Sequence, residues 1–213
     1  ESALSPVEKL RNRIENPASD ADVFEAVLSK IQNNISLTRQ SLDTQSCTQA
    51  VDAILAAEHI GIVGYGSSSW LGGIFQRSLD PYRGKVQLLS SIEGSSYGAR
   101  ALSRLCKSDL LIAIAFPRYS ADTVFLARRA HQAGVPLLAL TDKRSSPLAP
   151  LASVTLYAAS ESTYFANSES STLALIEALS SAVAHRNRDS VRAARQLPAA
   201  AQPWLHGTPE SRL

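Results

Sequence analysis

The chain has 213 residues, of which 45% are hydrophobic and 19% are charged. This length and apolar content suffice for one α/β domain with a buried core and helical extensions. The 21 basic residues nearly balance the 19 acidic ones, so the composition alone does not indicate a nucleic-acid-binding surface. No apolar run approaches the roughly 18 residues that span a bilayer, so we expect no membrane partner and a cytoplasmic location.

The chain opens with neither the basic segment nor the apolar segment of a secretory signal peptide. It also contains no methionine, and we therefore expect it to be part of a longer protein. Residues 1–20 are mixed in character and carry turn signals at Pro6 and at Asn16-Pro17. They are predicted to be a linker.

From residue 20 onward the pattern predicts two helices ahead of any strand. In the first helix, apolar residues recur mainly at helical spacing over polar ones, and in the second the apolar stripe is shorter. The two stripes consist of Val23, Val27, Ile31, Ile35 and Leu42, and then of Ala50, Val51, Ile54, Leu55 and Ala57. We expect these helices to form a dimer interface, because their apolar stripe extends past the sheet domain and would otherwise be exposed.

Five short apolar segments then alternate with helical ones, which predicts buried parallel strands separated by helices. The strands are predicted over residues 59–64, 85–90, 109–116, 135–140 and 153–157. The helices are predicted over residues 68–80, 95–106, 120–133 and 163–184. The short connections predict a three-layer, doubly wound, flavodoxin-like α/β domain that has a five-stranded parallel sheet and an N-terminal helical extension.

This domain is predicted to occupy residues 21–185, with its sheet region beginning near residue 45. Residues 186–213 are predicted to form a C-terminal tail that is first Arg-rich and then Ala/Pro-rich. The basic run in this tail contains Arg186, Arg188, Arg192 and Arg195, is interrupted by Asp189, and has no interleaved aromatic residues. We interpret the run as a solvated helical end and not as a nucleic-acid site.

The first predicted strand ends in a Gly64-x-Gly66 turn, which Ser67, Ser68 and Ser69 follow. Two glycines let the backbone pass close to a ligand, and hydroxyl groups at the start of a helix favour an anion. The turn is neither a dinucleotide-binding GxGxxG nor a P-loop, because Ser69 replaces the third glycine and no lysine follows. The alternative interpretation is a tight turn with a serine helix cap.

The second predicted strand runs into Ser90 and Ser91, and the third runs into Arg118 and Ser120. Parallel strands end at the same edge of a sheet, so these side chains are expected near the serines of the first turn. Hydroxyl donors with one forked cation suit a phosphorylated sugar, although the serines could instead be helix caps. The predicted ligand-binding residues are Gly66, Ser67, Ser68, Ser90, Ser91, Arg118, Ser120 and Glu169.

Three segments occur in order: the Gly64-x-Gly66-x-Ser68 turn, Phe116-Pro117-Arg118-Tyr119-Ser120, and the run from Gly134 through Thr141-Asp142 to Ser146-Pro147-Leu148. Together they resemble the SIS (sugar isomerase) domain, and more narrowly the SIS domain of RpiR-type bacterial transcriptional regulators. The segment from Ile35 to Ala57 is also similar to the part that precedes the domain in that family. The resemblance covers about residues 25–185.

The resemblance implies a phosphorylated sugar or sugar acid as effector, and a homodimer or homotetramer. It also implies DNA binding through an N-terminal helix-turn-helix domain, which this sequence lacks. The chain departs from the family after the third strand, where many SIS domains carry S-x-S-G-x-T. Here Ala115-Phe116-Pro117-Arg118-Tyr119-Ser120 occupies that stretch, so Ser120 remains and Arg118 can compensate as a forked cation.

SIS enzymes isomerise sugar phosphates with a general base, often a glutamate near the last helix, and frequently with a histidine. Glu169 is the best candidate for a base, although an acidic residue in the first turn of a helix is also favoured by the helix dipole. None of the four histidines lies at the predicted site, and His59 is expected at the opposite edge of the sheet. We therefore predict an effector-binding domain and no enzyme, with a sugar-phosphate isomerase as the alternative.

The sequence predicts neither a cofactor nor a metal site, because no two histidines or cysteines have the close spacing of metal ligands. The two cysteines, Cys47 and Cys106, lie far apart in the chain. We expect them to be buried, reduced thiols.

Overall fold

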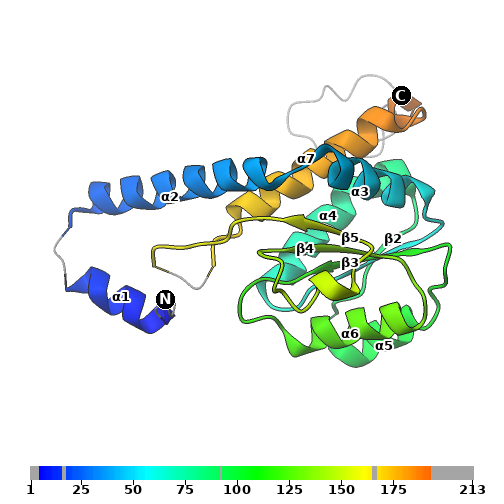
Figure 1. The fold of residues 1–213 in the computed structure, drawn as a ribbon, viewed down its shortest axis with the longest axis horizontal. Coiled ribbons are helices and arrows are strands. Elements are labelled where there is room, and N and C mark those ends of the chain that lie inside the picture. Colours follow the sequence, from blue (N-terminus) through cyan, green and yellow to red (C-terminus); the bar gives the residue numbers. More distant parts are fainter. Residues whose placement is uncertain (1–4, 16–17, 92, 165–166, 193–213) are drawn as a thin grey trace, which may run out of the picture.

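The computed structural model describes residues 5–15, 18–91, 93–164 and 167–192 (Figure 1). Its centre is a sheet of five parallel strands in the order β2-β1-β3-β4-β5, which confirms the predicted doubly wound α/β fold. The strands are β1 (Ile60–Val63), β2 (Val86–Leu88), β3 (Leu110–Ile114), β4 (Leu137–Thr141) and β5 (Val154–Tyr157). Strands β3 and β4 are buried at every position, because each lies between two neighbouring strands and both sheet faces are covered.

Helices cover both faces of the sheet, as Figure 1 shows. One face packs against α3 (Thr44–Ala56), α4 (Ser67–Arg83) and α7 (Ser170–Arg186). The other face packs against α5 (Ser95–Leu102) and α6 (Ala121–Gln132). Alternate strand residues serve the two cores: Ile62 and Ile112 pack on the first side, and Val63 packs on the second.

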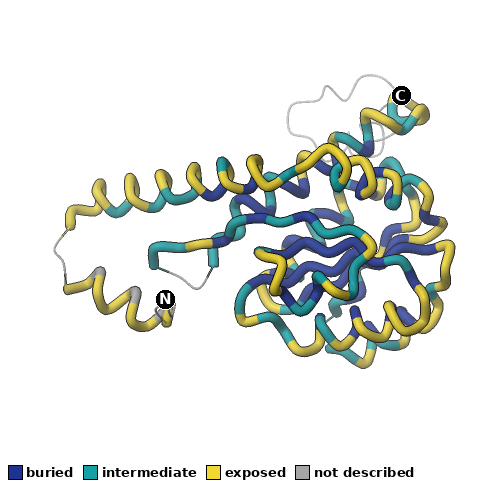
Figure 2. Tube along the Cα trace, in the orientation of Figure 1, coloured by how far each residue is buried: buried dark blue, intermediate teal, exposed yellow. Residues whose placement is uncertain are grey.

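Helix α2 (Asp20–Ser41) begins after Ser19, whose side chain forms a capping box with Asp22. Figure 1 shows it running beside the domain and projecting past the sheet, and Figure 2 shows most of its surface exposed. The two buried residues of the helix are polar, Asn34 and Thr38, whereas Val27 of the predicted apolar stripe is only half-buried. This helix was predicted, but its fully buried contacts with the domain are polar, and the residues of its predicted apolar stripe are at most half-buried.

Those polar contacts reach the last residue of β5 and the chain that follows it. The Asn34 side-chain amide donates to the Glu161 carbonyl oxygen at 2.7 Å. The Ala159 N–H donates to the Thr38 hydroxyl at 2.9 Å. The Ser41 hydroxyl donates to the carbonyl oxygen of the last residue of β5 at 3.1 Å. The position of α2 is therefore tied to the segment that leads from the sheet into α7.

Most predicted bounds differ from the structure by a few residues, and two differences are larger. The last helix, predicted from residue 163, begins at Ser170 because the preceding chain forms a loop, in which the Ser168 N–H donates to the Ser160 carbonyl oxygen. Within the predicted linker 1–20, residues Pro6–Ile14 form the helix α1. Its start is capped by Ser5 and Glu8, which bond reciprocally at 2.7 and 3.2 Å.

The expected burial of the cysteines is wrong for Cys106, which is exposed, and Cys47 is half-buried; both are free thiols. Cys106 lies in the turn that leads into β3, at the amino edge of the sheet. Among the helices that the structure describes, none is long and apolar enough to cross a lipid bilayer.

Candidate functional site

A cavity of about 410 Å³ lies at the carboxyl edge of β1 and β3. These two strands are the point where the strand order reverses, which is where doubly wound sheets bind ligands. The cavity is lined by Tyr65, Gly66, Ser67, Ser68, Leu71, Ile114, Ala115, Phe116, Pro117, Arg118, Ser120, Thr123, Asn167, Ser168, Glu169 and Thr172. Three parts of the chain thus form it: the turn after β1, the loop after β3, and the start of α7.

The turn after β1 brings the N-terminus of α4 to the cavity. Gly64 is required there, because a Cβ atom at this position would lie 2.8 Å from the Ser68 Cβ and 3.0 Å from the Ile114 carbonyl oxygen. Gly66 has a φ of +66°, a backbone conformation that glycine adopts without strain. Ser67 and Ser68 follow as the first residues of the helix, whose free N–H groups and dipole favour an anion.

The loop after β3 presents Arg118 in an unusual conformation. Its φ of +69° is the only positive value for a residue other than glycine in the described part of the chain. Next to it, the Tyr119 hydroxyl donates to the Asp142 carboxylate at 2.6 Å, and burial together with this bond raises the pKa of Tyr119. On the other side, the Asn167 side-chain amide donates to the Pro117 carbonyl oxygen at 3.1 Å. The loop is therefore fixed on both sides of Arg118.

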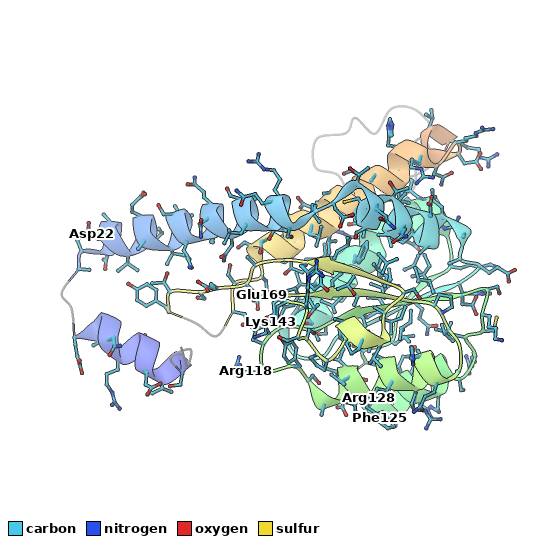
Figure 3. The ribbon with its side chains drawn as sticks, in the orientation of Figure 1. Asp22, Arg118, Phe125, Arg128, Lys143 and Glu169 are labelled. Carbon is cyan, nitrogen blue, oxygen red and sulfur yellow. The ribbon has the colours of Figure 1, made fainter. Side chains whose placement is uncertain are left out.

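The start of α7 supplies the third wall. Glu169 is the N-cap residue of the helix, and its side chain makes no capping hydrogen bond. Thr172 is 1% exposed, and its hydroxyl is buried without a hydrogen-bond partner. Figure 3 shows Glu169 and Arg118 at the same end of the sheet. The Thr172 hydroxyl has no partner among the described residues and lies just behind the cavity surface, so a polar ligand could satisfy it only if the side chain rotated toward the cavity.

The family is decided by a match of residues 53–182 to the family model of the SIS domain. The chain belongs to the SIS domain family. The matched range contains the whole sheet and all three walls of the cavity. No curated protein is similar enough in sequence to this chain to count as a match.

Solved structures with the same fold include domains of regulators and whole isomerases. The sugar isomerase domain of an RpiR transcription factor from Sphaerobacter thermophilus is 26% identical, with a TM-score of 0.76 over 82% of this chain and 97% of that one. NanR of Vibrio vulnificus, complexed with ManNAc-6P, is 21% identical, with a TM-score of 0.76 over 86% and 71% of the two chains. Phosphoheptose isomerase from Neisseria gonorrhoeae is 16% identical, with a TM-score of 0.63 over 78% and 98%.

In this SIS domain, six of the eight predicted ligand-binding residues line the cavity; Ser90 and Ser91 do not. The Ser90 hydroxyl instead accepts from the Gly64 N–H at 3.0 Å and donates to the Gly64 carbonyl oxygen at 2.6 Å. The Ser91 hydroxyl accepts from the Glu93 N–H at 3.2 Å. Ser90 therefore holds the turn after β1, and a direct contact of either serine with a ligand remains a prediction.

Several polar residues of the SIS cavity were not predicted from the sequence, chiefly Thr123, Asn167, Ser168 and Thr172. The helix predicted from residue 163 contains the last three, and of its residues only Glu169 was predicted to bind a ligand. A signal was present, because residues 167–172 form an uninterrupted polar run directly ahead of the apolar residues of α7. Such a run at the end of a sheet connection favours a loop and a helix start.

No histidine among the described residues lines the cavity of this SIS domain. His131 is exposed, with its Nδ1 3.0 Å from the Leu151 carbonyl oxygen, and His185 is exposed near the end of α7. His59 lies at the opposite edge of the sheet, as predicted, because it directly precedes β1. The cavity thus offers one carboxylate, that of Glu169, as a group able to move a proton.

The amino edge of the SIS sheet carries a separate cluster of three side chains, those of Glu58, His59 and Asp109. Their carboxylate oxygens and imidazole nitrogen lie within 4.8 Å of one another. The Asp109 carboxylate accepts from the N–H groups of His59 at 3.0 Å and Cys106 at 2.8 Å. Burial opposes its ionisation, but these bonds outweigh burial and lower the pKa of Asp109. The cluster therefore has a structural role, since Asp109 ties β1 to the turn before β3.

Proposed function

We propose that this SIS domain is the effector-binding domain of an RpiR-type transcriptional regulator. Its effector is a phosphorylated sugar or sugar acid. Binding of this effector controls DNA binding by a helix-turn-helix domain outside this sequence. The observation that carries the proposal is the cavity itself, which joins a helix N-terminus, hydroxyl groups and Arg118 but contains no histidine among its described lining residues. The 26% identity to an RpiR sugar isomerase domain supports the same class.

The phosphate or carboxylate of the effector binds between the N-terminus of α4 and the Arg118 side chain. The N–H groups of Ser67 and Ser68 carry the positive end of the helix dipole, and a guanidinium matches the geometry of an oxyanion. Arg118 is exposed and makes no ion pair with a described residue. The sugar hydroxyls then bond to Ser168 and, after a rotation of its side chain about χ1, to Thr172.

The chain between β5 and α7 connects the cavity to α2. This chain supplies Asn167 and Glu169 to the cavity, and its earlier part bonds to Asn34 and Thr38 of α2. An effector that favours one position of this chain shifts α2 and with it the spacing of the attached DNA-binding domains. It can do so only through a difference in its affinity for the two positions.

A sugar-phosphate isomerase is the second candidate, because the same fold occurs in phosphoheptose isomerases. In that case Glu169 is the base that moves a proton between neighbouring carbon atoms of the sugar. Its side chain makes no capping bond and lines the cavity, so it is placed to reach a ligand.

The first test is a thermal-shift screen of the chain against sugar phosphates and sugar acids, including ManNAc-6P, with turnover measured for every compound that binds. A ligand at about 100 times its dissociation constant should add about 2.7 kcal/mol of stability. Binding without turnover supports the effector domain. Binding with isomerisation that Glu169→Gln abolishes contradicts it and favours the isomerase.

Thr172→Val separates the proposed ligand contact from a structural role. The change removes a hydroxyl that is buried without a partner, so the free energy of unfolding should stay the same or rise. Affinity for the effector should fall by about 1 kcal/mol, because one hydrogen bond to the sugar is lost. Calorimetric titration and urea unfolding measure the two quantities, and an unchanged affinity would show that Thr172 does not contact the ligand.

A further inference from the structure

A second cavity, of about 490 Å³, lies between α2, α4 and the chain that leads into α7. Its walls are mainly apolar, in contrast to those of the first cavity. The apolar residues are Val27 and Ile31 of α2, Trp70, Leu71 and Ile74 of α4, and Leu173 of α7. Trp70 is 78% exposed, so a large aromatic face is open at this place.

The two cavities share one wall. Ser67, Leu71, Asn167, Ser168 and Glu169 line both of them. A molecule bound in the first cavity therefore lies directly beside the second. The second cavity is at least as large as the first, so it has room for a substituent of the size of an aromatic ring.

The charges of the second cavity disfavour an anionic occupant. Lys30, the one basic residue among its described lining residues, forms an ion pair with Glu161. A second phosphate or carboxylate would meet no unpaired cation there, and Glu169 in the shared wall would repel it. An apolar group instead gains from contact with Trp70 and the aliphatic side chains around it.

We propose that the effector is a sugar phosphate or phosphorylated sugar acid with an apolar substituent, and that the substituent lies against Trp70 in this second cavity. This inference rests on the proposed function and names the class of effector more narrowly. The polar cavity holds the phosphorylated sugar, while the apolar cavity selects against the unsubstituted sugar. The substituent also contacts Val27 and Ile31 directly, and so couples effector binding to the position of α2.

The test uses matched sets of hexose 6-phosphates with glucose, galactose and mannose configuration. Each is titrated as the free sugar, as its phenyl glycoside and as its N-benzoyl amino analogue, because the wall between the cavities does not fix which carbon bears the substituent. The 213-residue chain, Trp70→Ala and Phe125→Ala are compared by calorimetry. Phe125 is the control, since it is a 50% exposed aromatic residue on α6, at the opposite face of the sheet.

The expected result is that at least one substituted sugar phosphate binds about tenfold or more tightly than its parent. This ratio should fall to about one in Trp70→Ala and stay unchanged in Phe125→Ala. Equal binding of parent and substituted compounds, or a ratio that Trp70→Ala does not alter, overturns the inference but leaves the proposed function intact. If no sugar phosphate of either kind binds, the proposed function fails and the inference fails with it.

Discussion

Arg118 combines a forked cation with a backbone conformation that is costly for any residue except glycine. The cost is sustained because the residues beside it are anchored, Tyr119 to Asp142 and Pro117 to Asn167. Strained backbone that the surroundings hold in place is common at binding sites. The strained conformation lowers the stability of the loop but places the Arg118 guanidinium at the carboxyl edge of the sheet.

We predict opposite effects of Arg118→Gly on stability and on binding. Compared with Arg118→Ala, the glycine variant should have a free energy of unfolding about 1 kcal/mol higher, because glycine adopts a φ of +69° without strain. Both variants should bind the effector more weakly, by about 1.5–3 kcal/mol, with Arg118→Lys in between. Urea unfolding and calorimetric titration check this, and equal stability of the two variants would mean that the conformation carries no strain.

The sequence predicted the serine turn and Arg118 of the site, since these follow strands whose ends are marked by apolar runs. It did not predict Thr172, because only the packed structure shows that this hydroxyl is buried against the cavity without a partner. Nor did it predict the role of Ser90, whose bonds to Gly64 join residues 26 positions apart. Contacts of that kind depend on how neighbouring strands are aligned.

The connection between β1 and α4 depends on Ser90, which lies shortly after β2 and bonds to Gly64. Ser90→Ala should lower the free energy of unfolding by about 1–2 kcal/mol, because the buried Gly64 N–H and carbonyl oxygen each lose a partner. Ser91→Ala is the matched control, with an expected change below about 0.5 kcal/mol. If Ser90→Ala instead keeps its stability and loses effector affinity, Ser90 contacts the ligand, as the sequence predicts.

The strands were predictable because buried parallel strands are apolar without interruption, as in residues 110–114 and 137–141. Helix starts were harder. The polar residues around the start of α7 occur both at helix ends and inside helices, so their composition did not fix where this helix begins. In the structure it begins at Ser170, and Asn167 in the preceding chain bonds to the Pro117 carbonyl oxygen. The helix α1 was not predicted, because proline is a turn signal as well as a residue common at the first position of a helix, which is where Pro6 lies between Ser5 and Glu8 of the capping box.

Helices α1 and α2 expose apolar side chains, and we predict that a second copy of the chain covers them. Phe24 is 71% exposed and Leu28, one turn further along α2, is 54% exposed. The double variant Phe24→Glu, Leu28→Glu should convert a dimer into a monomer in sedimentation equilibrium, since burying carboxylates in an apolar interface is unfavourable. Phe125→Glu, on α6, should leave the mass unchanged. A wild-type chain that is already monomeric would contradict a dimer formed by these helices.

The cavity takes its walls from residues 64–68, 115–120 and 167–172, so its parts leave the ribosome at different times. Two walls are in place while the third is still being translated, and α7 must pack against α4 before the effector has a complete site. Effector binding is therefore a property of the finished domain and of no shorter nascent chain. An effector bound in the cavity would contact both residues 64–68 and residues 167–172, and it would therefore stabilise the packing of α7 against α4.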